Sequence, residues 1–176
     1  MNFELSEEQI AVKEAARDFA QNVLKPGVIE RDNLQKFPAE EMKLLGELGF
    51  MGMMVDPKYG GSGMDTISYV LAIEEISKVD ASAAVCMSVN NSLVAWGIDK
   101  FGTEAQKEKY LPGLVTGESK ASYCLTEPSS GSDALSAKAT AILSEDGKHY
   151  VLNGQKMWIT NAGFADLFTV FAQVDG

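Results

Sequence analysis

The sequence is poor in cysteine and histidine, the residues that form disulfides and zinc sites. It contains two cysteines, Cys86 and Cys124, and each lies inside an apolar run. Neither a disulfide framework nor a Cys-x-x-Cys metal site is therefore expected, and a reducing compartment is the natural interpretation. The single histidine, His149, has no nucleophile motif or zinc-ligand partners nearby, so we interpret it as a surface residue. We expect no bound metal.

Positive charge is also scarce, with 15 Lys and Arg against 25 Asp and Glu and a net charge of -10. This balance argues against nucleic acid or an anionic membrane as a main partner. No run of residues suggests a transmembrane segment, and the first residues resemble neither a signal peptide nor an Arg-rich presequence. We expect a cytoplasmic protein, or a mitochondrial matrix protein if the source is eukaryotic.

Glycine-rich nucleotide loops are missing as well. The stretch Gly60-Gly61-Ser62-Gly63 would need a further glycine at Thr66 to match GxGxxG, and no GxxxxGK[ST] motif occurs. The stretch also follows a predicted helix rather than a strand. We interpret it as a structural turn.

Helical periodicity dominates the first two thirds of the chain. Capping boxes begin helices at Ser6 and Thr103, and Pro26 with Gly27 is predicted to end the first helix near Lys25. One predicted helix is apolar or small almost all round, which is typical of a buried central helix. Acid pairs on the predicted helices are interpreted as solvated faces or dipole partners. The expected helices span residues 6–25, 38–48, 66–78, 81–98 and 103–115.

From Ser119 the sequence changes to short runs rich in β-branched and aromatic residues. Asn153-Gly154 predicts a type I′ hairpin turn, and the closing Asp175-Gly176 has no second strand behind it. Helices first and strands second predict an α+β chain, with a helical domain at 1–118 and an antiparallel, incomplete β-domain at 119–176. We expect that the chain is truncated. The predicted strands span residues 121–126, 138–143, 149–152, 155–160 and 166–174.

Hydroxyl groups and an indole cluster around the predicted strand ends. Thr126, Ser132 and Thr160 with the Gly131 amide suit the hydrogen-bonding edge of an isoalloxazine ring, and Trp158 suits its flat face. An ordinary hairpin with surface hydroxyls and a core tryptophan explains the pattern about equally well. Glu127, inside the same loop, is interpreted as a structural hydrogen-bond acceptor rather than a general base.

Several motifs are spread along the whole chain. They are Asp56-Pro57-Lys58-Tyr59-Gly60-Gly61-Ser62-Gly63, Phe101-Gly102-Thr103-Glu104-Ala105-Gln106-Lys107 with Tyr110-Leu111-Pro112 and Gly117-Glu118, Leu125-Thr126-Glu127-Pro128 with Gly131-Ser132-Asp133, and Asn153-Gly154 with Lys156-Met157-Trp158-Ile159-Thr160-Asn161. Together these motifs resemble the acyl-CoA dehydrogenase family. The resemblance implies a helical N-terminal domain, a middle β-domain and a C-terminal helical bundle that is missing here, with FAD held between the β-domain and the bundle.

The resemblance also implies roles for individual residues. Thr126 and Thr160 would meet the edge of the flavin ring, and Ser132 would lie at the pyrophosphate and near the CoA part of the substrate. Ser129-Ser130 departs slightly from the family pattern. The implied FAD-binding residues are Tyr123, Cys124, Leu125, Thr126, Gly131, Ser132, Trp158, Ile159 and Thr160.

The implied reaction is the α,β-dehydrogenation of acyl-CoA thioesters to trans-2-enoyl-CoA in fatty acid β-oxidation. A glutamate of the missing bundle would be the base, so no catalytic residue is assigned and the chain by itself is expected to be inactive. An electron-transfer flavoprotein would reoxidise FAD, and the full-length protein would be a homotetramer. The stretch 87–93 resembles short-chain, butyryl-type members. The alternatives are a non-catalytic binding module and an acyl-CoA oxidase or flavin monooxygenase of the same fold.

Overall fold

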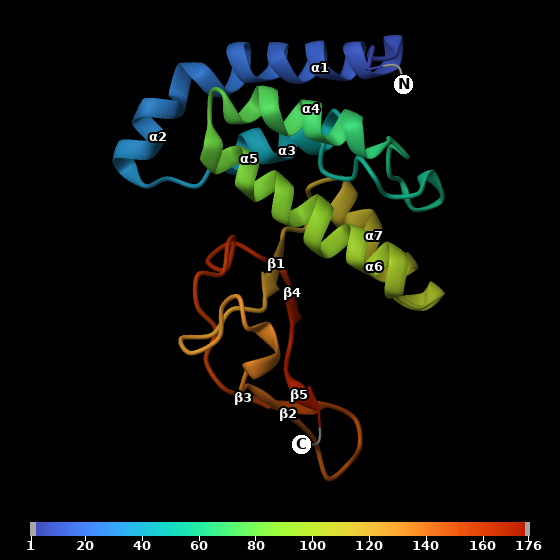
Figure 1. The fold of residues 1–176 in the computed structure, drawn as a ribbon, viewed down its shortest axis with the longest axis vertical. Helices are drawn as coiled ribbons and strands as arrows, with labels where there is room; N and C mark the ends of the chain where they lie inside the picture. Colours follow the sequence, from blue (N-terminus) through green and yellow to red (C-terminus); the bar gives the residue numbers. More distant parts are fainter. Residues whose placement is uncertain (1–2, 175–176) are drawn as a thin grey trace. The chain divides into compact units, whose positions relative to one another are not determined.

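The computed structural model describes residues 3–174, and the chain folds into two compact units, Met1–Lys120 and Ala121–Gly176 (Figure 1). The first unit contains the helices and the second contains the strands, which confirms the predicted order of helices before strands. The predicted turn at Asp175-Gly176 lies outside the described residues.

The first helix, α1 (Glu7–Phe19), begins at the predicted capping box. The Ser6 hydroxyl accepts the Gln9 amide at 3.2 Å, and the Gln9 side chain accepts the Ser6 amide at 3.0 Å. The first helical stretch ends near Lys25, as predicted, because α1 and the π-helical turn after it run to Leu24, but Pro26 and Gly27 do not break the helical path. Pro26 lies in the first turn of a short 3-10 segment, where a missing N–H breaks no helical bond, and the path continues into the next helix.

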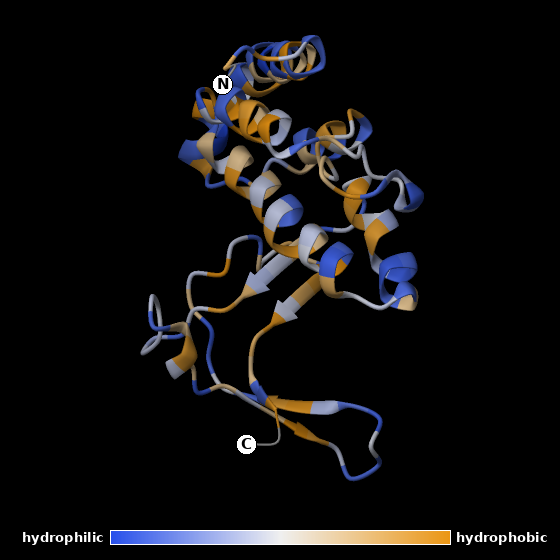
Figure 2. Ribbon diagram, turned by 45° about the vertical axis from the view of Figure 1, so that its right-hand side comes forward, coloured by the Kyte–Doolittle hydropathy of each residue, from blue (hydrophilic) through white to orange (hydrophobic). Residues whose placement is uncertain are grey.

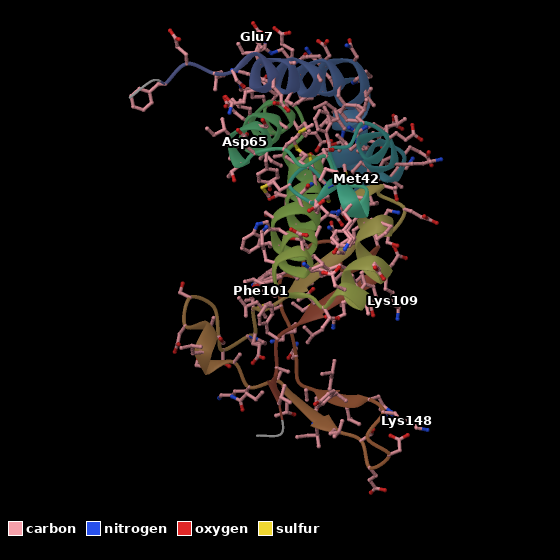
Figure 3. The ribbon with its side chains drawn as sticks, turned by 90° about the vertical axis from the view of Figure 1, so that its right-hand side faces the viewer. Glu7, Met42, Asp65, Phe101, Lys109 and Lys148 are labelled. Atoms are coloured by element: carbon pink, nitrogen blue, oxygen red, sulfur yellow. The ribbon has the colours of Figure 1, made fainter. Side chains whose placement is uncertain are left out.

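Among its described residues, the helical unit contains a further six α-helices and two π-helical turns. Capping side chains begin several of them: Asp65, labelled in Figure 3, accepts the Ser68 amide at 2.7 Å, and Asp80 accepts the Ala83 amide at 2.9 Å. The elements are a π-helical turn at Ala20–Leu24, a 3-10 segment at Lys25–Gly27, α2 (Val28–Leu34), α3 (Ala39–Glu47), a 3-10 segment at Pro57–Tyr59, α4 (Thr66–Ser77), α5 (Ala81–Ser88), a second π-helical turn at Val89–Ala95, α6 (Trp96–Phe101) and α7 (Glu104–Val115).

One hydrophobic core lies inside the helical unit. Phe19 of α1, Leu45 of α3, Ile76 of α4 and Met87 of α5 are all buried in it. Their spacing along each helix gives an apolar stripe on one face, which is the pattern that an amphipathic helix of a globular protein presents to its core. The predicted helices at 66–78 and 103–115 are confirmed as α4 and α7.

The continuous helical run Ala81–Phe101 combines α5, the second π-helical turn and α6. Its 21 residues are long and apolar enough to cross a membrane by length and composition, so the expectation that no run suggests a transmembrane segment is wrong by that measure. The run is also not buried all round, because Val85 and Leu93 are exposed while Met87 and Val94 are buried. That one-sided burial is the pattern of a core helix in a globular unit.

Two buried carboxamides fix this helical run to the chain that follows α3. The Met53 amide donates to the Asn91 side chain at 2.8 Å, and Asn91 donates to the Phe50 carbonyl at 2.8 Å. Asn90 donates to the carbonyls of Met51 and Leu114 at 3.0 Å each. Backbone groups of the chain after α3, and one carbonyl at the end of α7, are thereby satisfied in the protein interior, where an unpaired group is costly.

The glycine-rich stretch is a structural turn, as predicted. Gly60 has a φ of 88°, and a Cβ atom at Gly61 would lie 2.1 Å from the Val55 carbonyl oxygen. The four backbone amides of residues 60–63 donate to carbonyls of the same unit at 2.9 to 3.3 Å. They are therefore not free to bind a phosphate group.

The β-unit has two small sheets with mixed strand directions. Among the strands of the described residues one pair is antiparallel and two are parallel, so the predicted antiparallel domain is corrected to a mixed one. The antiparallel pair is joined by a short turn, whereas longer connections allow the other strands to pair in parallel. The first sheet pairs β1 (Ala121–Cys124) in parallel with β4 (Leu167–Val170), and in the second, β2 (Thr140–Leu143) pairs antiparallel with β3 (Tyr150–Asn153) and parallel with β5 (Gln173–Val174).

The β2–β3 hairpin turns before Asn153-Gly154. The Ser144 amide donates to the His149 carbonyl at 2.8 Å, and the Gly147 amide donates to the Ser144 carbonyl at 2.9 Å. Figure 2 shows this connecting loop as hydrophilic and the two strands as hydrophobic, and Figure 3 labels Lys148 in the loop. His149 is exposed there, which confirms its surface assignment.

The predicted type I′ turn at Asn153-Gly154 and the predicted strand at 155–160 are both wrong. Gly154 has a φ of 150°, and a Cβ atom there would lie 2.7 Å from the Ala139 backbone. The glycine is needed for this close approach of two chain segments rather than for a turn. The segment 155–160 follows without regular strand pairing.

Candidate functional site

The two segments that carry the predicted site residues lie side by side in the β-unit. The Met157 amide donates to the Thr126 carbonyl at 2.9 Å. Farther along, the Ser122 hydroxyl donates to the Thr160 carbonyl at 2.8 Å, and the Asn161 side chain donates to the Ala121 carbonyl at 3.1 Å. The structure thus brings the stretch around Thr126 next to the stretch 157–160, although the second stretch is an irregular loop and not a strand.

A tight turn follows the first segment. The amides of Glu127 and Ser130 each donate to the carbonyl of the other residue, at 2.9 and 3.1 Å, and the Ser130 hydroxyl donates to the Asp133 carbonyl at 2.8 Å. Gly131 and Ser132 come next and are exposed. A Cβ atom at Gly131 would meet no atom within 4 Å, so the space beside its backbone is open.

Glu127 connects three parts of the unit through its buried carboxylate. It accepts the amides of Lys138 and Ala139 at 2.6 and 2.9 Å and the Lys156 ammonium at 2.8 Å. The Lys138 amide and then Lys156 are the largest causes that lower the pKa of Glu127 to about 2. A carboxylate held this firmly in its ionised form is a poor general base. The interpretation of Glu127 as a structural acceptor is confirmed.

Trp158 is the most unusual residue of the predicted site. Its backbone φ is 58°, in the left-handed region that bulky residues rarely adopt, and 84% of the residue is exposed. A core tryptophan, which the ordinary-hairpin alternative requires, is therefore excluded. The indole is instead available at the surface to cover a planar molecule.

The remaining predicted residues form the support of this surface. The Tyr123 ring packs against Phe171 with a centroid distance of 4.8 Å. Cys124 is buried, and burial raises the pKa of its thiol, so this thiol has little of the thiolate form that reacts. Leu125 and Ile159 are half-buried. Within residues 3–174, no group of three or more His, Cys, Asp or Glu side chains could hold a metal ion.

Lys156 begins the motif at 156–161, but no role is predicted for it from the sequence. Its ammonium ion donates to the Leu125 carbonyl at 3.0 Å as well as to Glu127, and its side chain is 13% exposed. In the sequence, a lysine two residues before a tryptophan says little about the role of the lysine. Its acidic partner lies 29 residues earlier, so no local pattern could pair them.

Comparison with known proteins matches both units to one family. The family model for the acyl-CoA dehydrogenase N-terminal domain matches residues 6–118, and the model for the middle domain matches residues 122–176. A short-chain-specific acyl-CoA dehydrogenase of Clostridium acetobutylicum is 45% identical over 175 residues, which are 99% of this chain and 46% of that protein. The chain therefore spans about half the length of this relative.

Solved structures agree with the sequence comparison. An acyl-CoA dehydrogenase of Bacillus anthracis in complex with FAD is 43% identical with a TM-score of 0.93, over 98% of this chain and 30% of that chain. A structure described as the electron transferring flavoprotein of Acidaminococcus fermentans is 44% identical with a TM-score of 0.92, over 98% and 45% of the two chains. Both domain matches and the whole-length identity lead to one conclusion: the chain belongs to the acyl-CoA dehydrogenase family.

Proposed function

We propose that this chain is part of an FAD-dependent acyl-CoA dehydrogenase that converts short-chain acyl-CoA thioesters to trans-2-enoyl-CoA. The observation that carries the proposal is the exposed, left-handed Trp158 beside Thr126 and Thr160 in a member of this family. The exposed indole provides a flat apolar wall, and Thr126 and Thr160, on the two paired segments, carry hydroxyl groups that can supply a polar edge. This combination matches the shape and hydrogen-bonding groups of an isoalloxazine ring.

The residues present fit FAD in their donor chemistry. Thr126 and Thr160 supply hydroxyl donors for the ring edge, and the open space at Gly131 lets a phosphate group approach the backbone. When bound, FAD supplies the acceptor for the electrons that leave the substrate. We assign FAD binding to Tyr123, Cys124, Leu125, Thr126, Gly131, Ser132, Trp158, Ile159 and Thr160.

For the substrate, we propose that Ser132 contacts the CoA part of an acyl-CoA thioester, because its hydroxyl lies in the exposed stretch after the Glu127–Ser130 turn. The preference for short acyl chains is supported by the name of the Clostridium acetobutylicum relative and by the resemblance of residues 87–93 to butyryl-type members. Electrons then pass to an electron-transfer flavoprotein, a partner that the Acidaminococcus fermentans neighbour supports.

Removal of the α-proton is assigned to a carboxylate outside these 176 residues. Glu127 lies near the proposed flavin site, but both of its oxygens are hydrogen-bonded and its pKa is about 2. A base must bind a proton at the working pH, and Glu127 is poorly suited to do so. We therefore propose a glutamate in a C-terminal helical bundle, in a cytoplasmic or mitochondrial matrix homotetramer that serves fatty acid β-oxidation.

The test uses the natural full-length protein, purified with its flavin and mixed with butyryl-CoA without oxygen. Bleaching of the oxidised flavin absorbance, followed by reoxidation with an electron-transfer flavoprotein, is the expected result. Octanoyl-CoA is the matched control for chain length and should bleach the flavin more slowly. Rapid reoxidation by air would indicate an oxidase or monooxygenase instead. A protein that binds FAD but gives no bleaching with any acyl-CoA would overturn the proposed activity.

A further inference from the structure

Trp158 keeps a backbone conformation that its own side chain disfavours. Asn161, in the same loop, also has a positive φ, of 68°, but asparagine tolerates this region and its side chain is bonded to the Ala121 carbonyl. Trp158 has a bulky side chain, and most of it is exposed. Packing of the indole therefore does not explain the conformation, so the adjoining backbone must hold it.

Anchors lie on both sides of Trp158. After it, the Thr160 carbonyl accepts the Ser122 hydroxyl at 2.8 Å. Before it, the Met157 amide is bonded to the Thr126 carbonyl at 2.9 Å, and the Lys156 ammonium is bonded to Glu127 and the Leu125 carbonyl. The residues before the tryptophan are thus tied to the segment that carries Thr126.

The Lys156–Glu127 pair is the charged anchor among these, and both side chains are largely buried, at 13% and 4% exposed. Glu127 has its own fixed position, because the amides of Lys138 and Ala139 also donate to it. Lys156 is therefore attached to a rigid point of the unit. Charge-assisted hydrogen bonds are stronger than neutral ones, especially away from water.

We propose that Lys156 is a positioning residue that holds the backbone of Trp158 in its left-handed conformation and so fixes the indole as one wall of the flavin site. The proposal rests on the proposed function, because it assumes that a flavin lies against Trp158. Lys156 acts through the backbone and makes no contact with the flavin itself. When Lys156 is removed, the backbone of residues 156–158 relaxes. The indole of Trp158 then turns away from the flavin site beside Thr126.

The test compares Lys156→Met with Lys156→Arg in the full-length holoprotein. The measurements are the FAD dissociation constant, the visible circular dichroism of the bound flavin and the unfolding midpoint. We expect Lys156→Met to weaken FAD binding about tenfold or more and to change the flavin dichroism. Lys156→Arg keeps the positive charge and is expected to stay within about threefold of the wild-type dissociation constant.

Two further variants separate positioning from general stability. Glu127→Gln/Lys156→Met removes both buried charges and leaves no unpaired carboxylate, so it reports on the flavin site even if Lys156→Met alone folds poorly. Lys58→Met is the matched control, because it removes the exposed ion pair between Lys58 and Glu104, 2.7 Å apart in the helical unit. That control should leave the dissociation constant and the dichroism unchanged.

The outcomes distinguish this proposal from the proposed function. If the Lys156 variants lower only the unfolding midpoint and bind FAD with the wild-type constant and dichroism, the lysine has a structural role and the positioning proposal is wrong. If the wild-type holoprotein contains no flavin and binds none, the proposed function fails and the positioning proposal fails with it. A loss of binding in Lys156→Met and in the double variant, with recovery in Lys156→Arg, supports the proposal.

Discussion

The Arg31 guanidinium lies 2.9 Å from the Asp80 carboxylate, although 49 residues separate them in sequence. The same guanidinium donates to Glu41 at 2.7 Å and to the Leu24 carbonyl at 2.7 Å. One arginine thereby links α2, the start of α3, the preceding π-helical turn and the residue that caps α5. Its side chain is 11% exposed, so these are interior rather than surface ion pairs.

Replacing Arg31 by Met should therefore be severely destabilising. Two carboxylates would lose their common partner in a largely buried position, and breaking such a pair costs about 3 to 5 kcal/mol. The free energy of unfolding, measured by urea denaturation, checks the value. Lys58→Met is a suitable control, since Lys58 and its partner Glu104 are both more than half exposed. A loss for Arg31→Met no larger than for the control would contradict the assignment of a structural role to Arg31.

The buried carboxamide of Asn91 leads to a second prediction. Asn91→Ala removes the partners of the Met53 amide and the Phe50 carbonyl, and unsatisfied buried groups cost about 1 to 3 kcal/mol each. We expect a loss of about 2 to 6 kcal/mol in the free energy of unfolding. Ser92→Ala, on the next residue, removes only a bond from its hydroxyl to the Ser88 carbonyl and should change stability little. Equal effects of both substitutions would argue against the anchoring role of Asn91.

Two glycines of the helical unit should respond in opposite directions to alanine. Gly61→Ala forces a Cβ atom to within 2.1 Å of the Val55 carbonyl oxygen, so the turn must open, at a cost of about 1 to 3 kcal/mol. Gly97→Ala, in α6, meets no atom within 4 Å and should stabilise the helix by up to about 1 kcal/mol. Thermal unfolding of both variants tests the pair. A tolerated Gly61→Ala would show that this turn is not close-packed.

Each unit should lose stability in acid, because one buried carboxylate in it becomes protonated. Arg17 and then Lys78 lower the pKa of Glu75 in the helical unit to about 2, and the Lys138 amide with Lys156 does the same for Glu127. Both values lie below the ordinary value of 4.5, so the folded state binds fewer protons than the unfolded state. The two carboxylates contribute fully to the free energy of unfolding above about pH 4.5, and this contribution is lost as the pH falls toward 2.

Denaturation midpoints measured from pH 7 to pH 3 test this dependence. Glu75→Gln and Glu127→Gln should each flatten the acid-side slope, because a glutamine does not titrate. Glu145→Gln, on an exposed residue of the hairpin loop, is the control and should keep the wild-type slope. If Glu75→Gln and Glu127→Gln leave the acid-side slope unchanged, these two carboxylates do not govern the acid sensitivity.

Local signals in the sequence predict local structure well. The capping boxes at Ser6 and Thr103 lie three residues from their partners, and both are present in the structure. The order of helices before strands also follows from the change in residue pattern near Ser119. Long-range pairs are not visible in this way. Glu75 belongs to an acid pair on a helix that is interpreted as solvated, yet its side chain is 4% exposed. Its ion partner, Arg17, lies on a helix that is far away in the sequence.

The sequence motifs indicated the two segments that the structure brings together, around Thr126 and at 157–160, but not their geometry. The Asn153-Gly154 pair has the composition of a hairpin turn, yet the close approach of Ala139 determines the conformation of Gly154. The left-handed Trp158 depends on contacts with the segment around Thr126 that no sequence window contains. Long-range pairing overrides local propensity at these positions.

The exposed indole gives this protein an intrinsic optical reporter. The chain has two tryptophans, and Trp158 is far more exposed than Trp96, so Trp96→Phe leaves a single emitter in the second unit. An indole in water emits at long wavelength, and one covered by an oxidised flavin loses its emission by energy transfer. The residue that forms the proposed wall can therefore signal, without any label, when a planar acceptor arrives and when it leaves.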